Sequence, residues 1–287
     1  MNAIVFAAYI PTPDRIWLGQ MFLNSFKAYY SDCDIYVGNN SPCEDWIKTL
    51  DNSDLNIKHT TVPKDLVMDS DASAYQSALR SLKESGKNYD IVWFVHTKSS
   101  TRSVFMHLVL EIFERFINRR DLVEDSFSNP KIGAFLPYMA KVDNRHISGP
   151  LDVILPGSEH KHSGVSSYYT FYAVRGSVIK HFVENADPSF WDRKITSWRY
   201  PLEGGEIDGS LQPFDRYFFE REFPMVFERL GLSHDYLDEC YRLPGDHGLR
   251  NIDYFLQNST EEEKRRLNTQ PCEVRWGLLT YKNTRYT

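Results

Sequence analysis

The sequence DIVWFVHTKSS, residues 90–100, is the segment from which the architecture of this chain can be worked out. Its apolar run, Ile91 to Val95, is followed at once by the polar side chains of His96, Thr97 and Lys98. An apolar run of this length, bounded by polar residues, is typical of a strand that is buried on both faces of a sheet. We therefore expect a buried strand whose end presents polar and cationic groups.

Strand and helix patterns alternate on both sides of this segment. Strands are predicted at residues 3–10, 33–40 and 55–63, and helices at 18–30, 46–50 and 70–86, the last of them ending near Gly86. Repeated β-α units predict an α/β fold, with a Rossmann-like, mainly parallel sheet flanked by helices on both faces. Ligands bind beyond the carboxyl ends of the strands in such sheets, so we expect the residues after Val95 to lie there together with Tyr9 and Asn39-Asn40.

The second half of the chain is predicted to be less regular. Its pattern indicates a helix at 103–127 with a break near Asn118, strands at 131–139 and 168–176, a helix at 177–186 and an aromatic helix at 213–231. Residues 143–166 are expected to form a polar loop, and the tail from residue 233 a mixture of turns and short helices. We expect one domain at residues 1–232 and a helical or irregular C-terminal extension at 233–287 that packs on it.

Composition narrows the classes of function. The chain has 287 residues, of which 41% are hydrophobic and 14% aromatic, so it is expected to be globular. Its formal net charge of −6 argues against a general nucleic-acid binder. Residues 3–10 are too short to span a bilayer and follow no basic region, so neither a membrane span nor a signal peptide is expected. The four cysteines form no CxxC pair, which indicates reduced thiols in a cytoplasmic protein.

Three short motifs resemble one enzyme family. They are GNN at residues 38–40, the HTKS at 96–99 that ends the strand quoted above, and EIDGSL at 206–211. Their order within residues 2–230 resembles that of GT-A type glycosyltransferases. HTKS is similar to the rhamnan-synthesis F-like branch of polysaccharide glycosyltransferases, whose DGTL segment is close to EIDGSL. The resemblance implies a GT-A-like fold and the transfer of a sugar from a UDP-, GDP- or dTDP-linked donor to an oligosaccharide or other glycan acceptor.

The resemblance also assigns a place to the departing diphosphate. Most members end this strand in an Asp-x-Asp motif that holds Mn²⁺ or Mg²⁺, and His96-Thr97-Lys98 stands in that place here. Because a cationic side chain can neutralise the same charge, we expect Lys98 and Arg102, with His96 and Ser99, to bind the diphosphate and donor sugar without a metal cofactor. A bound Mn²⁺ or Mg²⁺ is one alternative, and an ordinary solvated Lys98 is another.

An acidic pair precedes the helix predicted at 70–86. Asp69 and Asp71, in MDSDAS, occupy the region near the nucleotide in the resembling family, where Tyr9 and Asn39 are expected to complete the site. A carboxylate before a helix is also a favourable N-cap, so capping is an alternative role, and metal binding is a third.

The acceptor side of the expected site depends on GGEIDGS, residues 204–210. Inverting transfer needs a carboxylate near the acceptor hydroxyl, and Asp208 is the first candidate for this base and Glu206 the second. Retention of configuration would remove the need for it. Trp198, Tyr200 and Asp215 are expected to contact the acceptor. The surplus aromatic residues either stack on sugar rings or form core, and this choice concerns Trp191, Trp198, Tyr200, Tyr217 and Phe218.

Two other classes of function compete with the transferase. A non-catalytic carbohydrate-binding or assembly module on the same scaffold would bind glycan without turning over any nucleotide sugar. A nucleotidyltransferase commonly has a glycine-rich phosphate loop after the first strand, and YIPTPDR contains no glycine before Gly19. The chain also has no Walker loop, GxSxG or GxGxxG motif.

Overall fold

The computed structural model describes residues 1–62, 72–97, 106–142, 165–167, 170–192, 219, 223–239 and 274–276. The N-terminal half follows the predicted alternation of strands and helices. Its elements are β1 (Ala3–Ala8), the 3₁₀ turn η1 (Pro13–Arg15), α1 (Ile16–Tyr29), β2 (Asp34–Asn39), α2 (Glu44–Asp51), β3 (Ile57–Thr61), α3 (Ala72–Glu84) and β4 (Ile91–His96).

The later elements are shorter and more varied. A helical segment consists of α4 (Met106–Ile112), the π-helix η3 (Phe113–Ile117) and α5 (Arg120–Phe127), so the predicted break near Asn118 is confirmed. The remaining elements are β5 (Ile132–Val142), β6 (Val165–Ser167), β7 (Tyr172–Arg175), α7 (Gly176–Asn185), α8 (Pro188–Asp192), the 3₁₀ helix η6 (Phe223–Leu230), β8 (Ser233–Glu239) and β9 (Val274–Trp276).

All nine strands of the described chain belong to one mixed sheet. Seven of them follow the order β3-β2-β1-β4-β7-β5-β6, and β8 and β9 also pair with β5. Strands β1 to β4 are mutually parallel, whereas β7 runs antiparallel to both β4 and β5. Because β8 is parallel to β5, only β6, β7 and β9 oppose the common direction. The prediction of an α/β fold with a mainly parallel sheet is therefore confirmed.

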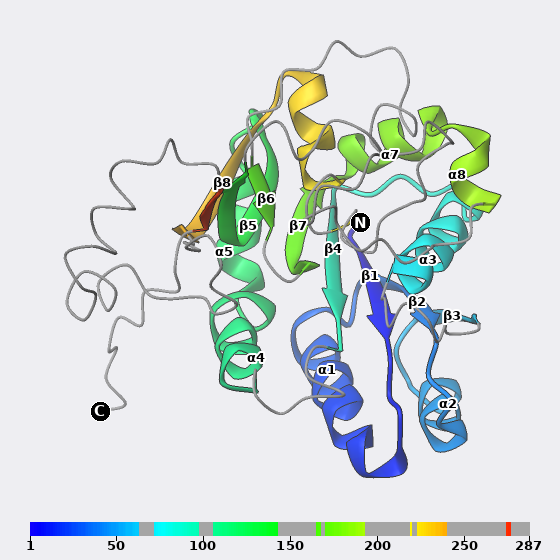
Figure 1. Ribbon diagram of the computed structural model, residues 1–287. Helices are drawn as coiled ribbons and strands as arrows, with labels where there is room; N and C mark the ends of the chain where they lie inside the picture. Colours follow the sequence, from blue (N-terminus) through cyan, green and yellow to red (C-terminus); the bar gives the residue numbers. More distant parts are fainter. Residues whose placement is uncertain are drawn as a thin grey trace, which may run out of the picture.

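Helices cover both faces of this sheet. Side chains alternate between the faces along each strand, so β1 contributes Val5 to one core and Phe6 to the other. The first core packs under α3 and α7 and the second under α1, α2 and the α4–η3–α5 segment, an arrangement that Figure 1 lets the reader follow. None of the helices in the described part of the chain has the length and apolar composition that a bilayer span requires.

Three sequence predictions for the second half are wrong in the described residues. Val165–Ser167, expected to end a polar loop, form β6 on the edge of β5. The described end of the expected aromatic α-helix is the 3₁₀ helix η6, and Pro224 near its start cannot donate a backbone hydrogen bond. The tail, expected to hold turns and short helices, contributes β8 and β9 to the sheet. Both pair with β5, so they form strands because of hydrogen bonds to a segment that is distant in the sequence.

Candidate functional site

The order of the strands creates a topological switch point between β1 and β4. The chain builds β2 and β3 on one side of β1 and then returns to add β4 on the other side. β1 and β4 end at the same edge of the sheet, as their arrowheads in Figure 1 show. Ligands of open α/β sheets bind beyond the carboxyl ends of the strands at such a switch point. This carboxyl edge is the candidate site.

Thr97 joins the two strands at the switch point. Its hydroxyl accepts a hydrogen bond from the backbone N–H of Tyr9 at 2.7 Å and donates one to the carbonyl oxygen of Tyr9 at 3.0 Å. Its own N–H donates to the carbonyl of Ala7 at 3.1 Å. Thr97 is buried and Tyr9 is partly buried, so the bonds between them are partly shielded from water. They fix the direction in which the chain leaves β4 immediately before Lys98.

A second set of neutral hydrogen bonds ties the end of β2 to the end of β1. The N–H of Asn40 donates to the carbonyl of Ala8 at 3.1 Å, and the N–H of Ile10 donates to the Ser41 hydroxyl at 2.8 Å. That hydroxyl in turn donates to the carbonyl of Ala8 at 3.3 Å. Both Asn40 and Ser41 are buried. The floor of the carboxyl edge is therefore a rigid network built from backbone groups, hydroxyls and amides.

Asn39, one of the residues predicted to bind the nucleotide, is part of this floor. Its side chain is fully buried, and its Oδ1 accepts the N–H of Ser41 at 3.2 Å. By strand alternation it shares a face with Val37, on the side of α1 and α2. Its Nδ2 has no hydrogen-bond partner among the described residues. Asn39 thus lies at the predicted edge, where its contacts shape the turn that follows β2.

Gly38 brings the start of α3 against the same edge. A Cβ atom at this position would lie 1.8 Å from the carbonyl oxygen of Ala74, so only glycine allows this approach. The amide of Asn40 also donates to the Ser73 hydroxyl at 3.3 Å. The N-terminus of α3, with its partial positive charge, therefore lies beside the ends of β1 and β2. This is the packing role of the GNN motif.

His96 ends β4 in an aromatic setting. It is buried, and its ring centroid lies 4.9 Å from that of Phe171 and 6.3 Å from that of Tyr75. Thr170, just before Phe171, has a φ of 52°, a left-handed conformation that is strained for a β-branched residue. Tyr75 Oη holds this strained residue by donating to its carbonyl oxygen at 3.1 Å. Strained backbone of this kind concentrates at functional sites, and here it positions a ring against His96.

Most of the other predicted site residues lie outside the described part of the chain. Tyr9, Asn39 and His96 are placed at the carboxyl edge, as expected. The remaining candidates lie in ranges that the structure does not describe: Asp69, Asp71, Lys98, Ser99, Arg102, Trp198, Tyr200, Glu206, Asp208 and Asp215. No motif in the sequence predicts a role for Thr97, Ser41 or Thr170. Hydroxyl residues directly after two strand ends were the available signal for the first two.

Of the surplus aromatic residues named in the sequence, the structure describes Trp191, and this residue belongs to the core. Trp191 packs on Phe182 and Phe190, with ring centroids 6.5 and 4.8 Å away, and Lys83 Nζ lies 4.6 Å from the centre of its ring. Phe219 and Phe223 are likewise buried. Of the two interpretations of the surplus aromatics, burial is thus correct for Trp191.

The end of β4 does not fit a divalent cation of the Mn²⁺ or Mg²⁺ type. These hard ions prefer carboxylate and carbonyl oxygens. The residues present are an imidazole, a hydroxyl already bonded to Tyr9, and then the ammonium of Lys98, which cannot coordinate a metal. Within the described residues no group of three or more His, Cys, Asp or Glu side chains converges on one point.

The opposite, amino edge of the sheet is organised by charge. Asp34, at the start of β2, accepts hydrogen bonds at 2.7 Å from both Lys87 Nζ and Tyr89 Oη, and it also accepts one from Asn56. Partial burial acts to raise the pKa of the Asp34 carboxyl, but these donors outweigh it and hold that pKa below its ordinary value. Burial, followed by the bonds to Tyr36 and Asp34, raises the pKa of Tyr89.

Two hollows of the described surface lie away from the carboxyl edge. One of about 560 Å³ lies between α1 and α2, and one of about 330 Å³ lies between α3, α7 and the start of β4. The candidate site is therefore assigned from topology and from its hydrogen bonds. No protein-family model matches the chain, and no curated protein matches it.

Proposed function

We propose that the chain is a glycosyltransferase that moves a sugar from a nucleotide-sugar donor to a hydroxyl of a glycan acceptor without a metal ion. The observation that carries the proposal is the sequence His96-Thr97-Lys98 at the end of β4, at the topological switch point of the sheet. A cationic side chain stands there in the place where the resembling family holds a metal. The GT-A-like fold is part of the same proposal.

Three features of the described edge support the binding of an anionic diphosphate. The bonds of Thr97 to Tyr9 fix the backbone at the end of β4, and Lys98 is the next residue in the sequence. The N-terminus of α3 adds a partial positive charge beside the ends of β1 and β2. Phe171, which directly follows the strained Thr170, packs against His96, and such strain is most common at functional sites.

The proposed reaction breaks the bond between the anomeric carbon of the sugar and the diphosphate oxygen. The acceptor oxygen forms the new bond to that carbon, and its proton passes to a carboxylate, for which Asp208 and then Glu206 are the candidates. The nucleoside diphosphate leaves with the bonding electrons. Lys98 and Arg102 stabilise the negative charge that develops on the leaving diphosphate, and this stabilisation lowers the activation free energy of the transfer. If configuration is retained, no base is required from this pair.

The first test is a thermal-shift screen with UDP-, GDP-, dTDP- and CMP-linked sugars, each with EDTA and with added Mn²⁺. We expect one class of donor to raise the melting temperature equally in both conditions. Release of nucleoside diphosphate is then measured with that donor. A requirement for Mn²⁺ would overturn the metal-independent mechanism, and binding without any turnover would favour a non-catalytic carbohydrate-binding module.

The second test compares two lysine variants. Lys98→Ala should lower kcat roughly 100-fold, because it removes a charge that acts on the leaving group. Lys180→Ala is the matched control, because Lys180 is an exposed lysine on α7 whose side chain is 53% accessible. The control should keep its full turnover. A Lys98→Ala variant with normal kcat and a normal melting temperature would refute the assignment of Lys98 to the diphosphate.

A further inference from the structure

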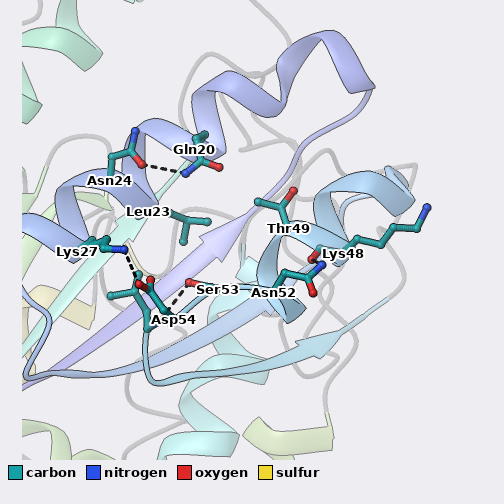
Figure 2. A pocket seen from close by; sticks show the side chains of 10 residues that line it. Gln20, Leu23, Asn24, Lys27, Lys48, Thr49, Asn52, Ser53 and Asp54 are labelled. Carbon is teal, nitrogen blue, oxygen red and sulfur yellow. Dashed lines mark hydrogen bonds and ion pairs between the residues drawn. The ribbon is translucent and has the colours of Figure 1, made fainter.

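An open groove between α1 and α2 has no role in the proposed transfer. It encloses about 560 Å³, and Figure 2 shows that its walls are mainly polar. One wall consists of Gln20, Asn24 and Lys27 from α1, and the other includes Thr49 from α2 and Asn52 just after it. The two walls converge toward the loop that leads into β3.

The charges of the groove are balanced. Lys27 is paired with Asp54, which closes one end of the groove in Figure 2. Lys48 Nζ lies 3.0 Å from the Asp45 carboxylate on the same helix. Each lysine thus has its own carboxylate, and neither an anion nor a cation would find an uncompensated charge here. The ligand that fits this groove is neutral.

In three amide side chains of the groove, one polar atom makes a hydrogen bond within the protein and the other makes none with the described residues. Gln20 Nε2 donates to Asn24 Oδ1 at 2.9 Å, which leaves the Gln20 oxygen as an acceptor and the Asn24 Nδ2 as a donor. Asn52 Nδ2 donates to the carbonyl of Lys48 at 2.7 Å, which leaves the Asn52 oxygen as a second acceptor. These three atoms have no partner among the described residues. The α1 wall therefore offers both a donor and an acceptor, and the α2 wall offers an acceptor.

The groove also has an apolar component. Leu23, which is buried, and Leu55, which is partly buried, form part of its lining. Trp17 is not among the residues that line the groove, but it lies one helical turn before Gln20 on α1, and 47% of its surface is exposed. A ligand with hydroxyls at its rim and C–H groups on its faces meets all of these features.

We propose that this groove binds a neutral oligosaccharide. Sugar hydroxyls act as donor and acceptor at once, which matches the mixed amide groups, and the C–H face of a ring can pack on leucine and tryptophan side chains. The open shape suits an elongated chain. The proposal rests on the groove itself and would stand even if the carboxyl edge bound no nucleotide sugar.

The test uses the full chain and three uncharged probes, maltohexaose, cellohexaose and mannohexaose, with hexagalacturonate as the charged counterpart. Binding is measured by calorimetry and by saturation-transfer NMR at millimolar concentration. We expect at least one neutral hexasaccharide to bind and hexagalacturonate to bind more weakly. Absence of binding by all three neutral probes, or tighter binding of hexagalacturonate, would overturn the proposal.

Variants locate the bound chain. Asn24→Ala combined with Asn52→Ala should weaken binding about tenfold, because two amide hydrogen bonds are lost. Asn185→Ala is the control, since Asn185 Nδ2 donates to the carbonyl of His181 at 2.8 Å in the same way that Asn52 bonds to Lys48. The control should bind normally. Equal affinity in the double variant, or equal loss in the control, would refute a site in this groove.

A last comparison separates this proposal from the transferase. Lys98→Ala should leave hexasaccharide binding unchanged, whatever it does to nucleotide sugars. If Lys98→Ala abolished hexasaccharide binding, the glycan would lie at the carboxyl edge and the groove proposal would fail. Loss of donor binding with intact hexasaccharide binding would support it.

Discussion

The two edges of the sheet are held together by different chemistry. At the amino edge, Asp34 is paired with Lys87 and Tyr89, and Arg120 with Asp32 and Glu124. At the carboxyl edge, the bonds that join β1, β2 and β4 come from neutral hydroxyl, amide and backbone groups. The difference shows that an edge of a sheet can be held in place by neutral hydrogen bonds, which add no net charge to that edge. Charge there is left to the segments that follow the strands, such as the one that begins with Lys98.

The largest effect is expected from Gly38→Ala, which attacks the contact between α3 and β2. The added Cβ would lie 1.8 Å from the Ala74 carbonyl oxygen, so α3 must move, and we expect the free energy of unfolding to fall by about 3 kcal/mol or more. Gly86→Ala is the control. Gly86 has a φ of 65° but open space around its Cβ direction, so about 1 kcal/mol should be lost. Urea unfolding measures both, and equal losses would contradict this account.

The next effect concerns the charged edge and depends on pH. Asp34→Asn should lower the free energy of unfolding by about 2 kcal/mol at pH 7, because a hydrogen-bonded carboxylate is lost. The folded pKa of Asp34 is lowered, so the unfolded state takes up its proton first as the pH falls. The stability that Asp34 supplies is therefore complete above its unfolded pKa of about 3.9 and disappears as the pH falls through the lower folded value.

Unfolding curves of Asp34→Asn and the natural chain, recorded from pH 7 down to pH 3, test this prediction. The difference in stability between the two should shrink on the acid side. A difference that stays constant to pH 3, with both chains folded, would mean that Asp34 is not stabilised as a carboxylate.

Thr97→Val probes the neutral edge in the same way. The variant removes the hydroxyl that bonds the N–H and the carbonyl of Tyr9 in a partly buried place, so about 1–3 kcal/mol of stability should be lost. Thr97→Ser keeps the hydroxyl and should lose less. In contrast to Asp34→Asn, the deficit should be the same at pH 7 and at pH 3. A deficit that changes with pH would show that a titrating group takes part in this joint.

The smallest effect is a gain of stability at Thr170. Thr170→Gly should raise the free energy of unfolding by up to about 1 kcal/mol, because glycine adopts the left-handed conformation without strain. Part of this gain is offset, because glycine loses more conformational entropy on folding than threonine does. Thr170→Ala keeps the strained backbone and should show no gain. A stabilising alanine variant would mean that the threonine side chain, rather than the backbone, is unfavourable.

The sequence predicts the N-terminal half of the fold well because its signals are local. The apolar run of β4, the helical spacing of α1 and the glycine at the end of α3 each specify an element within a few residues. β8 carries no such signal. Its sequence, SHDYLDE, is mostly polar, and it becomes a strand because the edge of β5, far away in the chain, offers hydrogen bonds.

The candidate site shows the same division. Repeated β-α units place the carboxyl ends of their strands at one edge of the sheet. The sequence therefore predicted correctly that Tyr9, Asn39 and His96 lie at the same edge, beside the ends of β1, β2 and β4. The hydrogen-bond partner of the Thr97 hydroxyl and the backbone angle of Thr170 could not be foreseen, because each depends on a residue in a different part of the chain.

The pairing of β8 with β5 also has a consequence during protein synthesis. Ile132 in β5 lies opposite Ser233 in β8, so the ribosome must add about a hundred residues after β5 begins before β8 exists. At the usual rate of synthesis this takes roughly 5–20 s. Until then one side of β5 carries unpaired N–H and C=O groups, the kind of template on which nascent chains aggregate. A ribosome that stalls between these strands would release a chain that needs a chaperone to stay in solution.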